Sequence, residues 1–212
     1  MTRKLLVAIA LAGSALAASA APVTLITGAT QGLYNNGLGN VLNGTSQPFP
    51  NNGVDDLTYS YNTAPNLAPA AAALGNWLTA PTAPGGTWGA APQAIPGSWT
   101  VGTEDAIIYS FDAGDGLTNF QASFGVDNGI FVWLDGVFMG GFRNAGGATL
   151  GEFQFSVASL SGGTHHLQVL REDHGGGTGY AVRVTGNTVP EPGSLALAGL
   201  ALLGLGLARR KA

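Results

Sequence analysis

The sequence predicts an all-β protein, an antiparallel β-sandwich or jelly roll, with a short hydrophobic segment at each end. Apolar residues alternate with polar ones over most of the stretch from Ser98 to about Gly186. Glycine accounts for 34 of 212 residues, and Asn-Gly and Asp-Gly pairs recur between the apolar stretches. No long amphipathic helix pattern interrupts them. Many short strands joined by glycine-rich turns are typical of sandwiches.

Five segments show the period-two alternation of half-buried strands. Their inward-facing residues are Ile107, Tyr109 and Phe111; Phe120, Ala122 and Phe124; Phe153, Phe155 and Val157; Leu167 and Val169; and Tyr180, Val182 and Val184. A sixth segment, Ile130 to Leu134, is apolar at every position, as expected of a central strand covered on both faces. It leads through Asp135-Gly136, a type I′ hairpin signal, into a further strand.

The composition and hydrophobic pattern divide the chain into four parts. We assign residues 1–20 to a signal peptide, 21–97 to a loop-rich part with few strands, 98–188 to the β-sandwich core and 189–212 to a sorting tail. Within 21–97 we expect short strands at Val23–Ile26 and Leu57–Tyr61 and one helical turn around Ala70–Trp77. Loops as long as those between them are usually functional or mobile.

The N-terminus has the three parts of a secretory signal peptide. Arg3 and Lys4 supply the positive region, and an apolar stretch runs from Leu5 to Leu16. Ala18-Ser19-Ala20 then gives the small residues that signal peptidase requires. We expect cleavage between Ala20 and Ala21.

The C-terminus reads Val189-Pro190-Glu191-Pro192-Gly193, followed by an apolar segment and then Arg209-Arg210-Lys211. This order resembles the PEP-CTERM family of bacterial exported proteins. The resemblance implies an exosortase-type membrane protease that recognises the tail and cuts near Pro190, Glu191 and Pro192. It also implies a role beside an exopolysaccharide or biofilm matrix, at the cell surface or in the extracellular matrix.

The apolar part of the tail, Leu195 to Ala208, is expected to form a short membrane helix. Its fourteen or so residues reach roughly 21 Å, against a hydrocarbon core of about 30 Å, which suits a transient stop better than a permanent anchor. The alternative is a C-terminal helix packed in the domain core, which Gly199, Gly204 and Gly206 disfavour. Basic flanks at both ends place the intervening chain outside the cytoplasm.

Charge and cysteine content narrow the function classes. Between residues 21 and 190 the chain has three basic and eleven acidic residues, a formal net charge of −8, and no lysine. Almost nothing is available to neutralise phosphates, so nucleic acid is excluded as a partner. The chain has no cysteine, and therefore no disulfide, thiolate metal site or cysteine nucleophile.

Residues 98–186 carry a second resemblance. An acidic turn and a strand ending in Asp-Gly (Val126–Gly136) precede a Gly-Thr-His stretch that leads into another strand (Leu160–Leu167). This pattern resembles the PA14-type β-sandwich. The resemblance implies a glycan-binding module. Some sugar-binding members hold calcium through two consecutive Asp residues joined by a cis peptide, where this chain has Asp127-Asn128.

Carboxylates and amides in turns give three candidate calcium positions, one at Asp112 and Asp115, one at Asp127 and Asn128, and one at Asp55 and Asp56. The alternative at each is ordinary turn chemistry, because Asp in turns hydrogen-bonds its own backbone. Histidine is a weaker metal candidate, since the neighbours His165 and His166 point to opposite faces of a strand.

Trp77, Trp88 and Trp99 lie in or beside the loop-rich part and are candidate contacts for sugar rings, whereas Trp133 is expected in the core. No nucleophile elbow, metalloprotease helix or phosphate loop is present in the exported part. We therefore expect a non-enzymatic protein that binds polysaccharide or has a structural role in the matrix. The alternative is a secreted hydrolase acting on the same matrix, for which carboxylates are available but need not converge.

Overall fold

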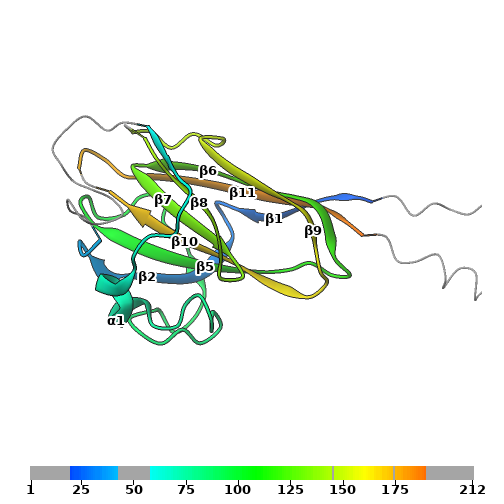
Figure 1. Ribbon diagram of the computed structural model, residues 1–212, viewed down its shortest axis with the longest axis horizontal. Coiled ribbons are helices and arrows are strands. Elements are labelled where there is room, and N and C mark those ends of the chain that lie inside the picture. Colours follow the sequence, from blue (N-terminus) through cyan, green and yellow to red (C-terminus); the bar gives the residue numbers. More distant parts are fainter. Residues whose placement is uncertain (1–19, 43–57, 145, 174, 190–212) are drawn as a thin grey trace, which may run out of the picture. The chain divides into compact units, whose positions relative to one another are not determined.

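The computed structural model describes residues 20–42, 58–144, 146–173 and 175–189. Residues Ala21–Val189 form one compact unit, a β-sandwich of two antiparallel sheets (Figure 1). The predicted fold class is confirmed. Residues 1–19 of the predicted signal peptide and residues 190–212, with the predicted membrane helix, lie outside the described residues. No helix in the described ranges has both the length and the apolar character of a membrane span.

The smaller sheet has four strands in the order β1-β11-β6-β9. Their bounds are Pro22–Thr27 for β1, Gly179–Thr188 for β11, Leu117–Asp127 for β6 and Phe153–Leu160 for β9. The inward residues predicted on β6, β9 and β11 do face the opposite sheet, and Gln154 and Ser156 of β9 are exposed. This sheet therefore has one face in the core and one in solvent, as alternation predicts.

The larger sheet has seven strands in the order β3-β8-β7-β10-β5-β2-β4. The strands are β2 (Gln31–Gly39), β3 (Tyr59–Tyr61), β4 (Gln93–Ala94), β5 (Glu104–Asp112), β7 (Gly129–Leu134), β8 (Val137–Arg143) and β10 (Thr164–Glu172). Strands β7 and β8 form the predicted hairpin, in which Asp135 and Gly136 have φ of 50° and 77°. Both central residues of a type I′ turn need positive φ.

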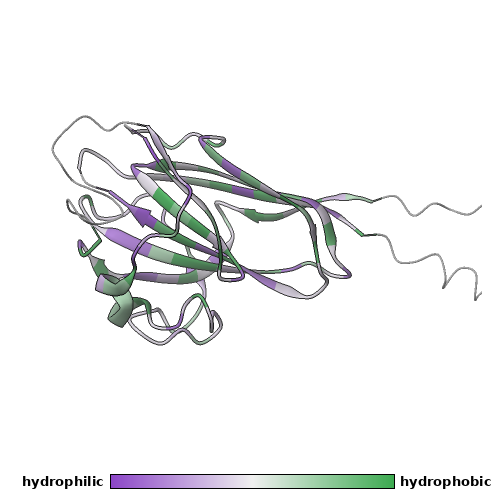
Figure 2. Cartoon of the chain, in the orientation of Figure 1, coloured by the Kyte–Doolittle hydropathy of each residue, from purple (hydrophilic) through white to green (hydrophobic). Residues whose placement is uncertain are grey.

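Two apolar clusters flank the larger sheet. The main core lies between the sheets and includes Ile107, Phe120, Phe124 and Val169. The second covers the outer face of the larger sheet, where Leu74 and Trp77 pack against Ile108, Phe131 and Trp133. Figure 2 shows hydrophobic and hydrophilic residues alternating along the strands. Strands β5 and β10 were predicted to be half-buried, but both are buried on two faces because the second cluster covers them.

The segment before residue 98 supplies this cover. It contains a 3-10 helix η1 (Ala68–Ala70) and a four-residue helix α1 (Ala71–Leu74), close to the predicted helical turn. It also contains β1, near the predicted strand at Val23–Ile26, and β3 inside the predicted 57–61. Strand β2 was not predicted. Its sequence carries three glycines and an Asn-Asn-Gly turn signal, and its pairing with β5 shifts register between Asn35 and Gly39.

The first and last strands of the compact unit pair with each other. Strand β1 lies along β11, with Pro22 opposite Asn187. At the end of this pair the Thr188 amide donates to the Ala21 carbonyl at 2.9 Å, and the Ala21 amide donates to Thr188 Oγ1 at 3.3 Å. The two residues at which the predicted export signals join the compact unit are therefore neighbours.

Candidate functional site

Polar side chains gather where β6 ends and β7 begins. Asp127 and Asn128 join these strands through a cis peptide bond. Asn144 lies just after β8. Its backbone N–H donates to the backbone carbonyl of Asn128 at 3.0 Å, which places Asn144 beside this junction. A glycine-rich loop follows: Gly146 donates to Asn144 Oδ1 at 3.0 Å and Gly147 to Asp127 Oδ2 at 3.2 Å. One carboxylate and two side-chain amides therefore share one end of the sandwich.

Asp173 holds the neighbouring loops at the same end. Its Oδ2 atom accepts hydrogen bonds from the Gly102 amide at 2.5 Å and the Gly175 amide at 3.1 Å. The Asn128 amide donates to the Glu172 carbonyl at 3.1 Å, so the end of β10 is tied to the β6–β7 junction. Asp173 is 1% exposed. Its position suits it to fix loop conformation rather than to meet a ligand.

A row of aligned residues crosses the larger sheet at this end. Tyr59 pairs with Arg143, Arg143 with Gly129, Gly129 with Glu172 and Glu172 with Glu104. Tyr59, at one side of the row, is 57% exposed, and its ring meets Tyr61 edge-on at 4.8 Å. Tyr61 in turn lies 4.8 Å from Phe131. Tyr59 is thus an exposed aromatic ring on a packed support, opposite Arg143, which directly precedes Asn144.

The two carboxylates of this row are buried. Glu104 and Glu172 are 1% and 0% exposed. Glu104 accepts hydrogen bonds from the Val41 and Leu42 amides at 2.9 and 3.2 Å. Burial raises the pKa of Glu104 to about 7, these two amides oppose the rise, and the nearby Glu172 charge adds to it. A raised carboxyl pKa is typical of a catalytic acid, but neither side chain is accessible to a polymer.

A second buried charge cluster lies between the sheets. Arg171 Nε and Nη2 donate to the two oxygens of Asp105 at 2.7 and 2.6 Å, and Tyr34 Oη donates to Asp105 Oδ2 at 2.7 Å. The guanidinium also lies over the rings of Trp99 and Tyr180, at 4.3 and 4.5 Å. Because both ions are paired and hydrogen-bonded, their burial is tolerated, and the cluster has a structural role.

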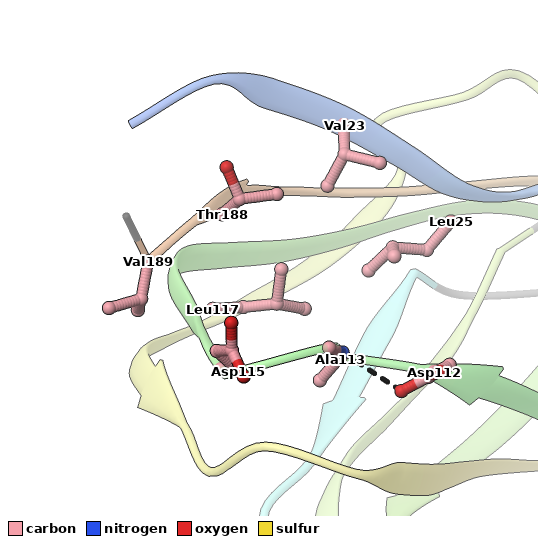
Figure 3. Close-up of a pocket in the computed structure, with 10 residues that line it drawn as sticks. Val23, Leu25, Asp112, Ala113, Asp115, Leu117, Thr188 and Val189 are labelled. Atoms are coloured by element: carbon pink, nitrogen blue, oxygen red, sulfur yellow. Dashed lines mark hydrogen bonds between the residues drawn. The ribbon is translucent and has the colours of Figure 1, made fainter. Parts of the chain in front are cut away.

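The candidate calcium position at Asp55 and Asp56 lies outside the described residues. The candidate at Asp112 and Asp115 lies at the far end of the sandwich. Strand β6 separates it from Asp127 by eleven residues, roughly 35 Å. Asp112 Oδ1 accepts the Gly114 amide at 2.8 Å, the turn contact that was the alternative there (Figure 3). Asp112 and Asp115 border a surface pocket whose apolar lining includes Val23, Leu25 and Leu117 (Figure 3). The two acidic positions therefore cannot share one ion.

The three candidate tryptophans lie in different surroundings. Trp77 is 2% exposed and meets Trp133 edge-on at 5.2 Å, so its ring is part of the outer cluster. Trp88 is half-buried, stacks 6.0 Å from Trp77 and donates from Nε1 to the Leu74 carbonyl at 2.9 Å. Trp99 is half-buried and covers Arg171 with one face. Only Trp88 and Trp99 of the three retain exposed ring surface.

The neighbouring histidines have separate partners, as their opposite directions predict. His165 Nδ1 lies 2.6 Å from Asp135 Oδ2 and its Nε2 lies 3.0 Å from the Ser161 carbonyl. His166 Nδ1 lies 2.9 Å from Ser110 Oγ. Within the described ranges, no three His, Asp or Glu side chains are placed to hold a metal ion together. The oxygen donors at Asp127, Asn128 and Asn144 are of the type calcium prefers, and calcium there stays a prediction.

Sequence reasoning missed Tyr59 and Asn144. Asn144 precedes Ala145-Gly146-Gly147, a turn signal that could have drawn attention to it. Tyr59 carried no such signal, because only the pairing of β3 with β8 brings it to this end. The sorting residues Pro190, Glu191, Pro192, Arg209, Arg210 and Lys211 lie outside the described residues.

Comparison with known proteins identifies the tail. Residues 188–211 match the PEP-CTERM protein-sorting motif, which marks the chain as exported and bearing a C-terminal membrane-anchor sorting signal. The expected resemblance of the tail is confirmed. No curated protein matches the chain.

Solved structures give low-similarity matches. A β-glucuronidase of Bifidobacterium dentium, complexed with coumarin-3-O-glucuronide, matches with 14% identity and a TM-score of 0.40, over 73% of this chain and 20% of that one. This chain thus spans about a fifth of that enzyme. The PA14 domain of the MpAFP antifreeze protein has 12% identity and a TM-score of 0.31, covering 82% and 92%. A PA14 sugar-binding domain from an RTX adhesin has 12% identity and a TM-score of 0.30, covering 77% and 94%. None of these matches says what this chain binds.

Proposed function

We propose that the chain is delivered by its sorting motif to the cell surface or extracellular matrix, where its β-sandwich binds polysaccharide. Export is marked by the motif at residues 188–211. The observation that carries the binding proposal is the half-buried carboxylate of Asp127 at the β6–β7 junction, with the exposed ring of Tyr59 at the same end of the sandwich. Asn128 and Asn144 are 2% and 8% exposed and support the junction from inside. A carboxylate accepts hydrogen bonds from sugar hydroxyls, and an aromatic ring packs against the apolar face of a sugar.

Processing at both ends is part of this proposal. Signal peptidase would cut between Ala20 and Ala21, and an exosortase-type protease would act near Pro190, Glu191 and Pro192. The start of β1 at Pro22 supports the first cut, because the sandwich begins directly after it. The hydrogen bond from the Val189 amide to the Gly116 carbonyl, at 3.1 Å, supports the second, because the sandwich ends just before Pro190. Loss of surface delivery after deletion of residues 189–212 is the expected result.

Binding is tested with the full-length chain by affinity electrophoresis in gels containing soluble polysaccharides. Tyr59→Ala should weaken binding by about three- to tenfold, the usual worth of one aromatic contact. Asp127→Asn should weaken it by about tenfold, because a charged acceptor becomes a neutral one. Val137→Ala is a matched control: Val137 is 64% exposed and lies at the opposite end of β8. Equal binding by wild type, Tyr59→Ala and Asp127→Asn would contradict this site.

A secreted hydrolase is the second candidate, and the raised pKa of Glu104 beside Glu172 is the observation in its favour. Their burial is the observation against it. Release of reducing ends from a polymer that the chain binds, lost in Glu104→Gln, would support hydrolysis. Saturable binding without such release supports a binding protein, and the absence of both supports a purely structural role in the matrix.

A further inference from the structure

The exposed face of the four-stranded sheet carries rows of uncharged polar side chains. One row crosses all four strands through Thr24, Thr185, Gln121 and Ser156, which are paired in register. All four are exposed or half-buried. A surface depression lined by Asn119, Gln121 and Ser156 adjoins this row. A row that runs across a sheet offers one side chain about every 4.8 Å, close to the length of one sugar ring in a polymer.

The neighbouring row contains an arginine. Thr27 pairs with Arg183, Arg183 with Ser123 and Ser123 with Gln154. Arg183 is exposed, since its neighbours Val182 and Val184 point into the core. It forms no ion pair with any described residue. The other two arginines outside the export signals are buried, at 9% for Arg143 and 0% for Arg171. Among the described residues, Arg183 is thus the one exposed guanidinium.

We call these two rows the polar face. Glu152 is the described carboxylate nearest to them in sequence, two residues before Gln154, and its oxygens accept hydrogen bonds from the Val126 and Thr149 amides. The described carboxylates are either buried or placed at the ends of strands. The buried ones are Glu104, Asp105, Glu172 and Asp173, and the others are Asp112, Asp115, Asp127, Asp135 and Glu152. Exposed charges more than about 8 Å apart are largely screened at physiological ionic strength. A ligand carboxylate at Arg183 therefore experiences the local cation more strongly than the net negative charge of the chain.

We infer that the polar face binds a carboxylated polysaccharide, with a uronate carboxylate on Arg183 and the sugar hydroxyls on Ser123, Gln154 and Gln121. The planar guanidinium presents paired donors that match a carboxylate. Hydroxyl and amide side chains supply both donors and acceptors for the uncharged part of the polymer. This inference rests on the proposed polysaccharide binding, and adds to it a second surface and the charge class of the polymer.

The test uses two polymers that differ only in charge: polygalacturonate and its fully methyl-esterified form. Affinity electrophoresis of the full-length chain should give about tenfold tighter binding to the acid form, the usual worth of one charged hydrogen-bonded contact. Arg183→Gln should reduce binding of the acid form to the level of the ester. Arg183→Lys should retain part of the difference, because it keeps the charge but not the paired donors. Unchanged melting temperatures verify that the variants fold.

Three results would overturn the inference. The first is equal binding of the acid and esterified polymers by the wild type. The second is full binding of the acid form by Arg183→Gln. In that case, loss of binding in Tyr59→Ala would still support polysaccharide binding as the function, but at the Tyr59 end of the sandwich and not on the polar face. The third is the absence of binding to both polymers and to any other polysaccharide, which would remove the proposed function as well.

Discussion

At the scale of single residues, His165 is the group whose protonation most clearly follows from its contacts. Both ring nitrogens face acceptors, a carboxylate oxygen of Asp135 and the carbonyl of Ser161. Both can donate only in the imidazolium form. Burial lowers the pKa of His165, but the hydrogen bonds to Asp135 and Ser161 outweigh it and the net effect is a raised pKa. The pair joins the β7–β8 turn to the start of β10.

This contact predicts a pH dependence of stability. A histidine whose folded pKa lies above its unfolded value of about 6.5 contributes full stability below that value and loses it as pH rises through the folded pKa. Urea unfolding of the wild type should therefore show a declining free energy from pH 6.5 upward. His165→Gln and Asp135→Asn should both flatten this decline. Equal slopes of unfolding free energy against pH in all three proteins would contradict the conclusion that His165 is protonated in the folded state.

Glu104 also makes the free energy of unfolding decline as pH rises, but over a lower pH range than His165. Its folded pKa of about 7 exceeds the ordinary value of 4.5, so the stability that it lends in acid declines between about pH 4.5 and 7. Glu104 is unchanged in all three proteins, so the His165 comparison depends on the difference in slope between the wild type and the two variants.

At the scale of elements, β6 shows how closely a strand and a loop can approach. A Cβ atom added at Gly125 would lie 2.5 Å from backbone atoms of Ala148 and Thr149. Glu152 holds this loop in place, because its carboxylate accepts the Val126 and Thr149 amides, each at 3.0 Å. The glycine therefore allows the loop beside Asp127 to lie on the strand.

Gly125→Ala should destabilise the fold by about 2 kcal/mol or more, since the neighbouring atoms are backbone and cannot yield easily. Gly28→Ala is the matched control: no atom lies within 4 Å of its Cβ position, and its φ is not in the left-handed region. That change should stay within about 0.5 kcal/mol. Chemical denaturation of both variants measures the difference, and similar losses in the two would refute the close approach.

Local sequence signals explain which elements were predictable. Strands with clean alternation, such as β6 and β9, were predicted because one face meets the core and the other solvent. Strand β2 was not predicted, because its glycines and its Asn-Asn-Gly sequence are turn signals. Its strand conformation comes from pairing with β5, which is a tertiary effect. The burial of both faces of β5 was not predicted, because the residues that cover its outer face, such as Leu74 and Trp77, lie more than twenty positions away in the sequence.

The candidate site was predictable in part for the same reason. Asp127 and Asn128 were found from their own turn. Tyr59 reaches that end only through pairing of β3 with β8, and the polar face exists only because four strands align in register. Trp77, a candidate sugar contact from the loop-rich part, fills the outer cluster against Trp133. Long-range pairing of this kind leaves no local trace in the sequence.

At the scale of the whole molecule, each sheet needs a strand from the loop-rich part. Strand β1 covers the edge of β11 in the smaller sheet, and β2 lies next to β5 in the larger one. The same part also covers Ile108, Phe131 and Trp133 on the outer face. Residues 98–188, predicted as the sandwich core, thus contain most strands but only part of the packing.

A fragment of residues 98–188 should therefore fail to fold cooperatively, whereas residues 21–189 should unfold in a single transition. The fragment would leave the outer apolar face uncovered, and so should bind the dye ANS and lack near-UV circular dichroism. Thermal melts followed by both far-UV and near-UV signals make the comparison. A sharp, coincident transition for the fragment would show that the N-terminal strands are dispensable.

If the chain is held at the cell surface through its C-terminal segment, as proposed, the pairing of β1 with β11 has a mechanical consequence. Tension on the tail enters the sandwich at Val189 and continues into β11, which is flanked by β1 on one side and β6 on the other. If a bound polymer restrains the opposite end, the load runs along the strand and is shared among the hydrogen bonds of both ladders. Shear of this kind resists rupture better than the peeling of an edge strand, so the attachment point coincides with a strong part of the fold.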